Sequence, residues 1–181
     1  TKTLRCTDAR CPAKNLKKFE RFVSRTGFEI DGISSATIRD FVNEHFISGF
    51  GDIFRLAQHA EEIKKLEGYG EKSCENLLAA VEKSRTVAPA RLITAMCIPL
   101  IGTDAAQRLV RALGWKGFLD RLENGEGFED VEGFGAERSS SLMAWYCDEE
   151  NRAAFLDVLS EVAVEPQEAS SGEGRCTGLT F

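Results

Sequence analysis

The stretch Leu66-Glu67-Gly68-Tyr69-Gly70-Glu71-Lys72-Ser73 decides how this chain is interpreted. Two glycines one residue apart permit a tight turn with positive φ, and a backbone without side chains can approach another molecule closely. The run that follows, up to Leu78, is predicted to be helical, and the unpaired N–H groups at its start suit a phosphate oxygen. A single Gly-x-Gly is most often only a surface turn, so its recurrence matters.

The stretch recurs four times, with a spacing of 36, 32 and 33 residues between successive copies. A fixed period over several units is typical of a repeat architecture. When the copies are aligned on the second glycine, that slot holds Ser34, Gly70, Gly102 and Gly135.

Other slots of the repeat keep their chemical type. The slot of the first glycine holds Gly32, Gly68, Leu100 and Gly133, and the apolar slot between the two holds Ile33, Tyr69, Ile101 and Phe134. Four residues after the second slot come Ile38, Cys74, Ala106 and Ser139, which are mostly small, as close packing of helices requires.

This pattern resembles the helix-hairpin-helix family of DNA-binding motifs. The resemblance implies an all-α fold with four tandem motifs. Ser34 and Leu100 each replace a glycine, in the first and third units. We therefore expect the second and fourth units to bind DNA more closely, and the first and third to be partly structural.

Composition limits how such a chain can bind DNA. The 181 residues carry a formal net charge of −6 with a pI near 5.1, which argues against binding through bulk electrostatics. Backbone N–H groups aimed at phosphates are not excluded, and we expect weak DNA binding by this chain alone.

No apolar run approaches the roughly 18–20 residues of a membrane span, and residues 1–5 do not resemble a signal peptide. Because the chain starts at Thr1, we expect it to be part of a longer, cytoplasmic protein.

Two of the six cysteines, Cys6 and Cys11, form a close pair with four residues between them. Such a loop commonly supplies half of the four ligands of a structural zinc ion. From spacing alone, free cysteines near a frayed terminus are an equally good interpretation. Cys74, Cys97 and Cys147 lie singly on apolar helical faces and are predicted to act as small hydrophobes.

The run from Arg5 to Gly32 is similar to the bacterial NAD-dependent DNA ligases, in which a four-cysteine zinc finger leads directly into a tandem helix-hairpin-helix domain. Cys6 and Cys11 match the last two zinc ligands of that family, and Cys97 stands where the family commonly has glycine. The resemblance implies four segments: the C-terminal half of the zinc finger (1–17), the tandem helix-hairpin-helix domain (18–164), a linker (165–177) and the first residues of a BRCT domain (178–181).

The resemblance also implies a function. The parent enzyme would use NAD, Mg²⁺ and zinc to seal single-strand nicks in duplex DNA during replication and repair, as a monomer associated with the bacterial nucleoid and not with a membrane. This chain would grip minor-groove phosphates without sequence specificity, require no cofactor, and bind zinc poorly. The DNA-binding residues implied are Gly32, Ile33, Gly68, Gly70, Lys72, Ser73, Gly102, Gly133 and Gly135, assisted by Arg25 and Arg39.

The catalytic chemistry of that family is not expected in this chain. Its nucleophile is a lysine in a Lys-x-Asp-Gly motif, which no segment of the chain contains. The nearest match, Glu29-Ile30-Asp31-Gly32, has glutamate in place of the lysine. We therefore expect no catalytic residue here and no activity from the chain by itself.

Two alternative functions also use helix-hairpin-helix motifs. Tandem hairpins can serve as an interaction scaffold in a DNA repair complex with little DNA affinity of their own, and the acidic composition would suit that role. A DNA glycosylase with an iron–sulfur cluster needs four closely spaced cysteines, whereas those at 74, 97, 147 and 176 are far apart. Trp115 and Trp145 are interpreted as core residues in preference to base-stacking platforms.

Overall fold

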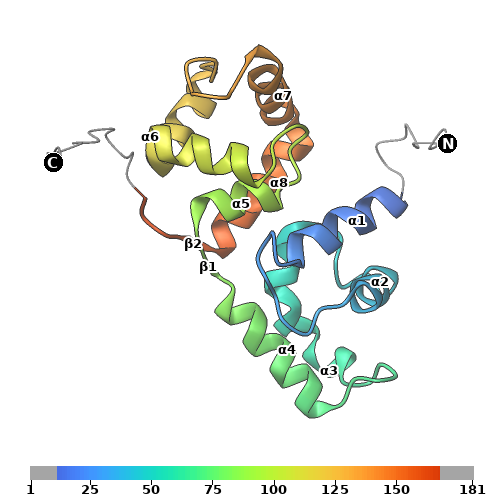
Figure 1. Cartoon of the computed structure of the whole chain (residues 1–181). Coiled ribbons are helices and arrows are strands. Elements are labelled where there is room, and N and C mark those ends of the chain that lie inside the picture. Colours follow the sequence, from blue (N-terminus) through green and yellow to red (C-terminus); the bar gives the residue numbers. More distant parts are fainter. Residues whose placement is uncertain (1–11, 168–181) are drawn as a thin grey trace, which may run out of the picture.

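The computed structural model describes residues 12–167, and helices make up nearly all of its regular structure (Figure 1). The expected all-α fold is thereby confirmed. The expected boundary between residues 17 and 18 falls inside the first helix. The helices are α1 (Pro12–Val23), α2 (Ser35–Asn43), the 3₁₀ helix η1 (Phe50–His59), α3 (Ala60–Ile63), α4 (Glu71–Lys83), α5 (Pro89–Ala95), α6 (Thr103–Asn124), α7 (Ala136–Cys147) and α8 (Glu149–Glu161).

The helices form two halves in chain order. Figure 1 shows α1 to α4 together in the lower half of the view and α5 to α7 in the upper half, with α8 reaching down between them. Helix α6 is interrupted at Gly114, whose φ of 68° and ψ of 172° are not helical. Its two parts therefore act as separate helices, as α2 and η1 do in the first half.

The guanidinium of Arg55, on η1, joins the two halves. It donates to both carboxylate oxygens of Asp157 at 2.9 and 3.0 Å, to Glu161 at 2.9 Å and to Asp52 at 2.7 Å. Asp157 and Glu161 lie on α8, so this cluster holds the last helix against η1. Gly51 leaves room for it, because a Cβ at that position would lie 2.0 Å from Asp157 Oδ2.

A two-residue parallel strand pair adds a second connection between the halves. Strand β1 (Thr86–Val87), which follows α4, pairs with β2 (Ala163–Val164), which follows α8. Beside it, Arg85 donates to the Glu161 carbonyl at 2.8 Å and to the Phe54 carbonyl at 2.6 Å. The ends of the two halves are therefore fixed by backbone and side-chain hydrogen bonds.

The core combines buried slots of the repeat with aromatic residues outside them, such as Phe22, Phe54 and Phe155. The residues four positions after the second slot are each no more than 1% exposed, as predicted: Ile38, Cys74, Ala106 and Ser139. Trp145 is 9% exposed and packs edge-on against Phe155, which confirms its interpretation as a core residue. Trp115 is partly buried, stacks on Phe118 and packs against the core from its edge. None of the helices between residues 12 and 167 combines the length and apolar composition needed to cross a bilayer.

Candidate nucleic-acid interface

The first-glycine slot takes the left-handed backbone conformation in all four predicted turns. The N–H of the next residue then closes a turn onto the carbonyl three positions back, for example Tyr69 to Leu66 at 3.0 Å and Phe134 to Val131 at 2.9 Å. A turn of this kind needs positive φ at its third residue, which glycine supplies without strain. The values of φ are 83° for Gly32, 86° for Gly68, 66° for Leu100 and 76° for Gly133.

Leu100 therefore follows the same backbone path as the glycines it replaces. Pro99 precedes it, and proline is favoured at the second position of such a turn. Cys97 also has positive φ, at 55°, which explains why glycine suits that position. The loss of glycine in the third turn thus changes the side chain presented and leaves the path of the turn intact.

The second-glycine slot is the N-cap of the following helix in each unit. Ser34, Gly70, Gly102 and Gly135 are all extended, with φ between −73° and −103°. Each carbonyl accepts the first helical hydrogen bond, at 2.9 to 3.1 Å, from the residue four positions later. Any residue can adopt these values of φ, so glycine is not required here for its backbone conformation. Its lack of a side chain leaves open space beside the backbone.

The helices α4, α6 and α7 begin without a side-chain cap, whereas α2 has one. Ser34 Oγ accepts a hydrogen bond from the Thr37 N–H at 3.1 Å. In the other three units no side chain at the N-cap bonds to the first turn. The first backbone N–H groups of those helices therefore remain available to an external acceptor.

The predicted glycines of the turns face open space, with one exception. A Cβ built on Gly32, Gly68, Gly70, Gly102 or Gly135 would meet nothing within 4 Å. At Gly133 the same atom would lie 3.1 Å from Nη1 of Arg108. Another molecule can therefore approach the backbone directly at the open positions, whereas it meets a guanidinium at Gly133.

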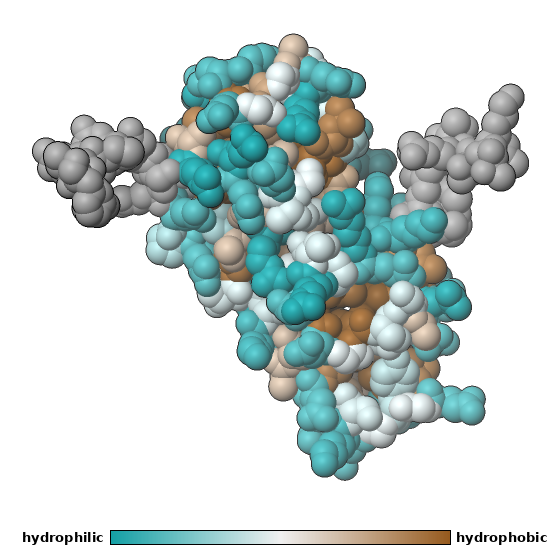
Figure 2. Space-filling model, in the orientation of Figure 1, coloured by the Kyte–Doolittle hydropathy of each residue, from teal (hydrophilic) through white to brown (hydrophobic). Residues whose placement is uncertain are grey.

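The first two turns lie beside one another across a groove. Residues from the first turn (Asp31, Gly32 and Ser34) and from the second (Gly68 and Tyr69) line it, together with Ser73 and Asn76 on α4. Figure 2 shows a mostly hydrophilic surface on the face of Figure 1, with apolar atoms at the bottom of a hollow in its lower half. The first and second turns are thus paired across this groove.

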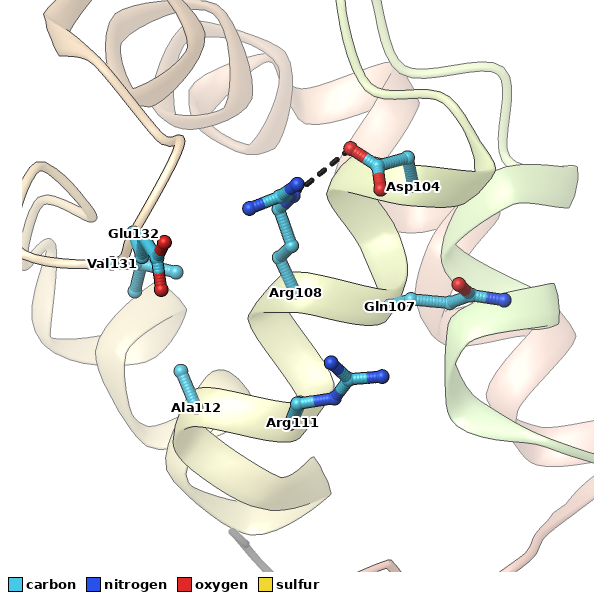
Figure 3. A pocket seen from close by; sticks show the side chains of 7 residues that line it. All are labelled: Asp104, Gln107, Arg108, Arg111, Ala112, Val131 and Glu132. Atoms are coloured by element: carbon cyan, nitrogen blue, oxygen red, sulfur yellow. Dashed lines mark hydrogen bonds and ion pairs between the residues drawn. The ribbon is translucent and has the colours of Figure 1, made fainter. Parts of the chain in front are cut away.

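Two arginines that the sequence did not single out converge on the fourth turn. Arg138 on α7 donates to the Gly133 carbonyl at 2.8 Å. Arg108 projects from α6 toward the segment that carries Val131 and Glu132 (Figure 3), where these residues line a recess with Arg111. Asp104 accepts from Arg108 Nε at 2.9 Å and raises the pKa of that guanidinium.

An acidic residue stands in the first turn of each uncapped helix, namely Glu71, Asp104 and Glu137. A carboxylate there stabilises the helix through its dipole but repels an incoming phosphate. Arg108 offsets this repulsion at the third unit by its ion pair with Asp104. In the recess beside α6 and the fourth turn, the two guanidinium groups of Arg108 and Arg111 therefore balance the carboxylates of Asp104 and Glu132.

The remaining predicted residues lie near the turns without forming one cluster. Lys72 and Ser73 are exposed in the first turn of α4, and Arg39 is exposed on α2. Arg25 has a side chain that is 93% exposed and lies 3.9 Å from Glu29. Ile33 is half-buried and packs against the core, so its backbone and not its side chain is available.

The spacing of the turns does not identify Arg108 and Arg138. They lie six and three residues after the second slot of their own units, and both are partly buried. The corresponding residues of the first half are Asp40 and Ser73, which do not share their charge, so no common slot drew attention to them.

The predicted zinc ligands Cys6 and Cys11 lie outside the described residues, so they stay predictions. Residues 168–177 of the predicted linker (165–177) and the predicted start of a BRCT domain (178–181) also lie there. Within residues 12–167 no three His, Cys, Asp or Glu side chains gather as a metal site would require.

Comparison with known proteins identifies relatives along nearly the whole chain. The chain is 32% identical over 182 residues to a DNA ligase of Lachnoclostridium phytofermentans, covering 99% of this chain and 28% of that protein. It is 31% identical to a DNA ligase of Ruminiclostridium cellulolyticum (99% and 27% covered) and 35% identical to one of Cereibacter sphaeroides (91% and 25% covered). No protein-family model matches the chain. The chain thus spans about a quarter of the length of these relatives, and over that length its similarity is consistent with a fragment of a bacterial DNA ligase.

Proposed function

We propose that this chain is the DNA-binding part of an NAD-dependent DNA ligase and holds duplex DNA beside a nick. The observation that carries the proposal is the common geometry of the four turns, each with a left-handed first slot and an extended N-cap. The relatives named DNA ligase support it, because the same segment recurs in them.

The grip would come from backbone N–H groups at the helix starts. Those of α4, α6 and α7 lack a side-chain cap, and the turn before each leaves the backbone accessible at Gly70, Gly102 and Gly135. Phosphate oxygens are strong acceptors for such groups, and phosphate contacts position a duplex without reading its sequence. A ligase that seals nicks at any sequence needs contacts of this kind.

The paired arrangement suits a duplex. The first and second turns lie across one groove, and α6 and the fourth turn border another recess. Two turns held at a fixed separation would take phosphates from the two strands that border the minor groove. The Arg55 cluster and the strand pair would keep the halves in a constant relation along the DNA.

The chemistry of sealing would reside elsewhere in the parent enzyme, which would act as a monomer in the bacterial cytoplasm. There NAD would supply the adenylate group that activates the 5′-phosphate, with Mg²⁺ bound at the same distant site. We expect no gain in mass corresponding to one AMP when this chain is incubated with NAD, because it lacks the nucleophilic lysine motif.

The proposal is tested by titrating the chain into fluorescent nicked and intact duplexes at low salt. Gly70→Val and Gly135→Val would weaken binding, because a branched side chain fills the open approach while φ stays permissible. The matched control is Gly117→Ala, where a Cβ meets only Leu113 at an ordinary 3.5 Å. Circular dichroism would establish that all three variants fold.

The outcomes separate the proposal from the scaffold alternative. Binding that falls steeply with salt and is weaker in the two valine variants supports phosphate gripping by the turns. Negligible binding by the unsubstituted 181-residue chain and by all variants would instead favour an interaction scaffold. Other parts of the enzyme would then supply the contacts to DNA.

A further inference from the structure

Leu100 is exposed at a position where the other turns present bare glycine. Its side chain is 54% exposed, and the only other large hydrophobic residue exposed within residues 12–167 is Leu156, at 50%. A Cβ at the equivalent Gly32 or Gly68 would project into open space. A side chain at this position therefore points away from the core, toward a molecule bound at the turns.

The turn that carries Leu100 is held rigidly. Ser141 Oγ, on α7, donates to the Pro99 carbonyl at 2.7 Å, and the Ile101 N–H donates to the Ile98 carbonyl at 3.1 Å. Ile98 and Ile101 are 4% and 2% exposed. The buried isoleucines and the proline fix the backbone, so the leucine is presented in one direction.

Leucine in this slot is unfavourable for the isolated chain. Its φ of 66° lies in the left-handed region, where an L-residue with a side chain is strained and glycine is not. Its exposed surface gains nothing from the core. Strained residues cluster at functional sites and ligand-binding segments.

We propose that Leu100 is an apolar contact to the minor groove, entering it when the third turn lies against DNA. The inference rests on the proposed function, because DNA is then the molecule that meets this slot. Proteins that bind the minor groove commonly insert apolar side chains between or against the base steps. Leu100 would pack on sugar and base edges, a contact that Gly32 and Gly68 cannot make.

The test compares Leu100→Gly and Leu100→Asn with Leu156→Asn in the 181-residue chain. Asparagine tolerates the left-handed region, and glycine restores the residue found in the other turns, so both Leu100 variants should fold. A melting temperature for Leu100→Gly at or above that of the parent chain would establish that any lost affinity is not unfolding. Dissociation constants are measured by fluorescence anisotropy on a nicked duplex over a range of NaCl concentrations.

We expect about tenfold weaker binding by both Leu100 variants, from the apolar surface no longer removed from water. Because leucine carries no charge, the slope of log affinity against log salt should not change. Leu156→Asn should bind as the parent chain does. If the parent chain binds DNA and the Leu100 variants bind equally well, the inference fails while the proposed function stands. If the parent chain does not bind DNA at any salt, both fail.

Discussion

The two glycines of the second turn are predicted to have different physical roles, and two alanine substitutions separate them. Gly68 has a φ of +86° and Gly70 a φ of −103°, while a Cβ on either would meet nothing within 4 Å. Steric clash is therefore absent from both variants. Any difference in stability between Gly68→Ala and Gly70→Ala must come from the backbone conformation.

The magnitudes follow from those dihedral angles. Placing an L-residue in the left-handed region costs about 1–2 kcal/mol, so Gly68→Ala should lower the free energy of unfolding by about that amount. At Gly70 two small effects oppose each other. Alanine is a poorer N-cap than glycine by up to about 1 kcal/mol, but it reduces the entropy of the unfolded chain by about 0.4–1 kcal/mol. The net change at Gly70 should be close to zero.

Urea unfolding followed by circular dichroism measures both variants under the same conditions. The order should be reversed for DNA affinity. Gly70→Ala should weaken DNA binding more than Gly68→Ala does, because Gly70 lies at the open helix start. Equal free energies of unfolding for the two variants would refute the assignment of the first glycine to turn geometry. A loss above about 1 kcal/mol at Gly70 would refute the assignment of the second glycine to open space.

Two further substitutions test the cap and the contact between the halves. Ser34→Ala removes the side-chain acceptor of the Thr37 N–H and should cost about 1 kcal/mol of unfolding free energy. The control Ser35→Ala, one residue along, should cost little. Equal losses of stability in urea would contradict the capping role. Arg55→Met leaves three carboxylates without their shared cation and should cost roughly 2–3 kcal/mol. In a double-mutant cycle with Asp157→Asn the two losses should fall short of additive, and strict additivity would show that the ion pair stabilises nothing.

The local structure followed closely from the repeat. Apolar slots at fixed offsets from each glycine pair predicted which helical faces are buried, since helical periodicity and the turn are both short-range properties. Ile38 and Ser139 illustrate this, being 0% and 1% exposed at equivalent positions of the first and fourth units. The resemblance to the ligases likewise rested on short runs of residues.

The packing between the halves did not follow from the sequence. Arg55 and Asp157 are 102 residues apart, and neither occupies a slot of the repeat. The pairing of β1 with β2 involves only two residues on each side, too few for a recognisable alternation. Long-range polar contacts of this kind depend on the complete fold, so no local pattern indicates them.

The backbone also indicates that the repeating element is a pair of turns. Glu29 and Cys97 have positive φ, at 52° and 55°, just before the first turn of each half, and the equivalent Lys65 and Asp130 do not. The two halves then differ in what they present at the turn tips. Gly32 and Gly68 leave bare backbone, whereas the second half presents the side chain of Leu100 and covers Gly133 with that of Arg108.

This difference has a consequence for how the two halves would hold DNA. Contacts by the first half would depend on backbone N–H groups, which carry no formal charge and tolerate most surface substitutions. Contacts by the second half would add a guanidinium and an apolar side chain to the N–H groups at the starts of α6 and α7, so single substitutions there should be more damaging. The acidic net charge of −6 is compatible with such a division, because affinity would come from a few aimed groups and not from the overall field.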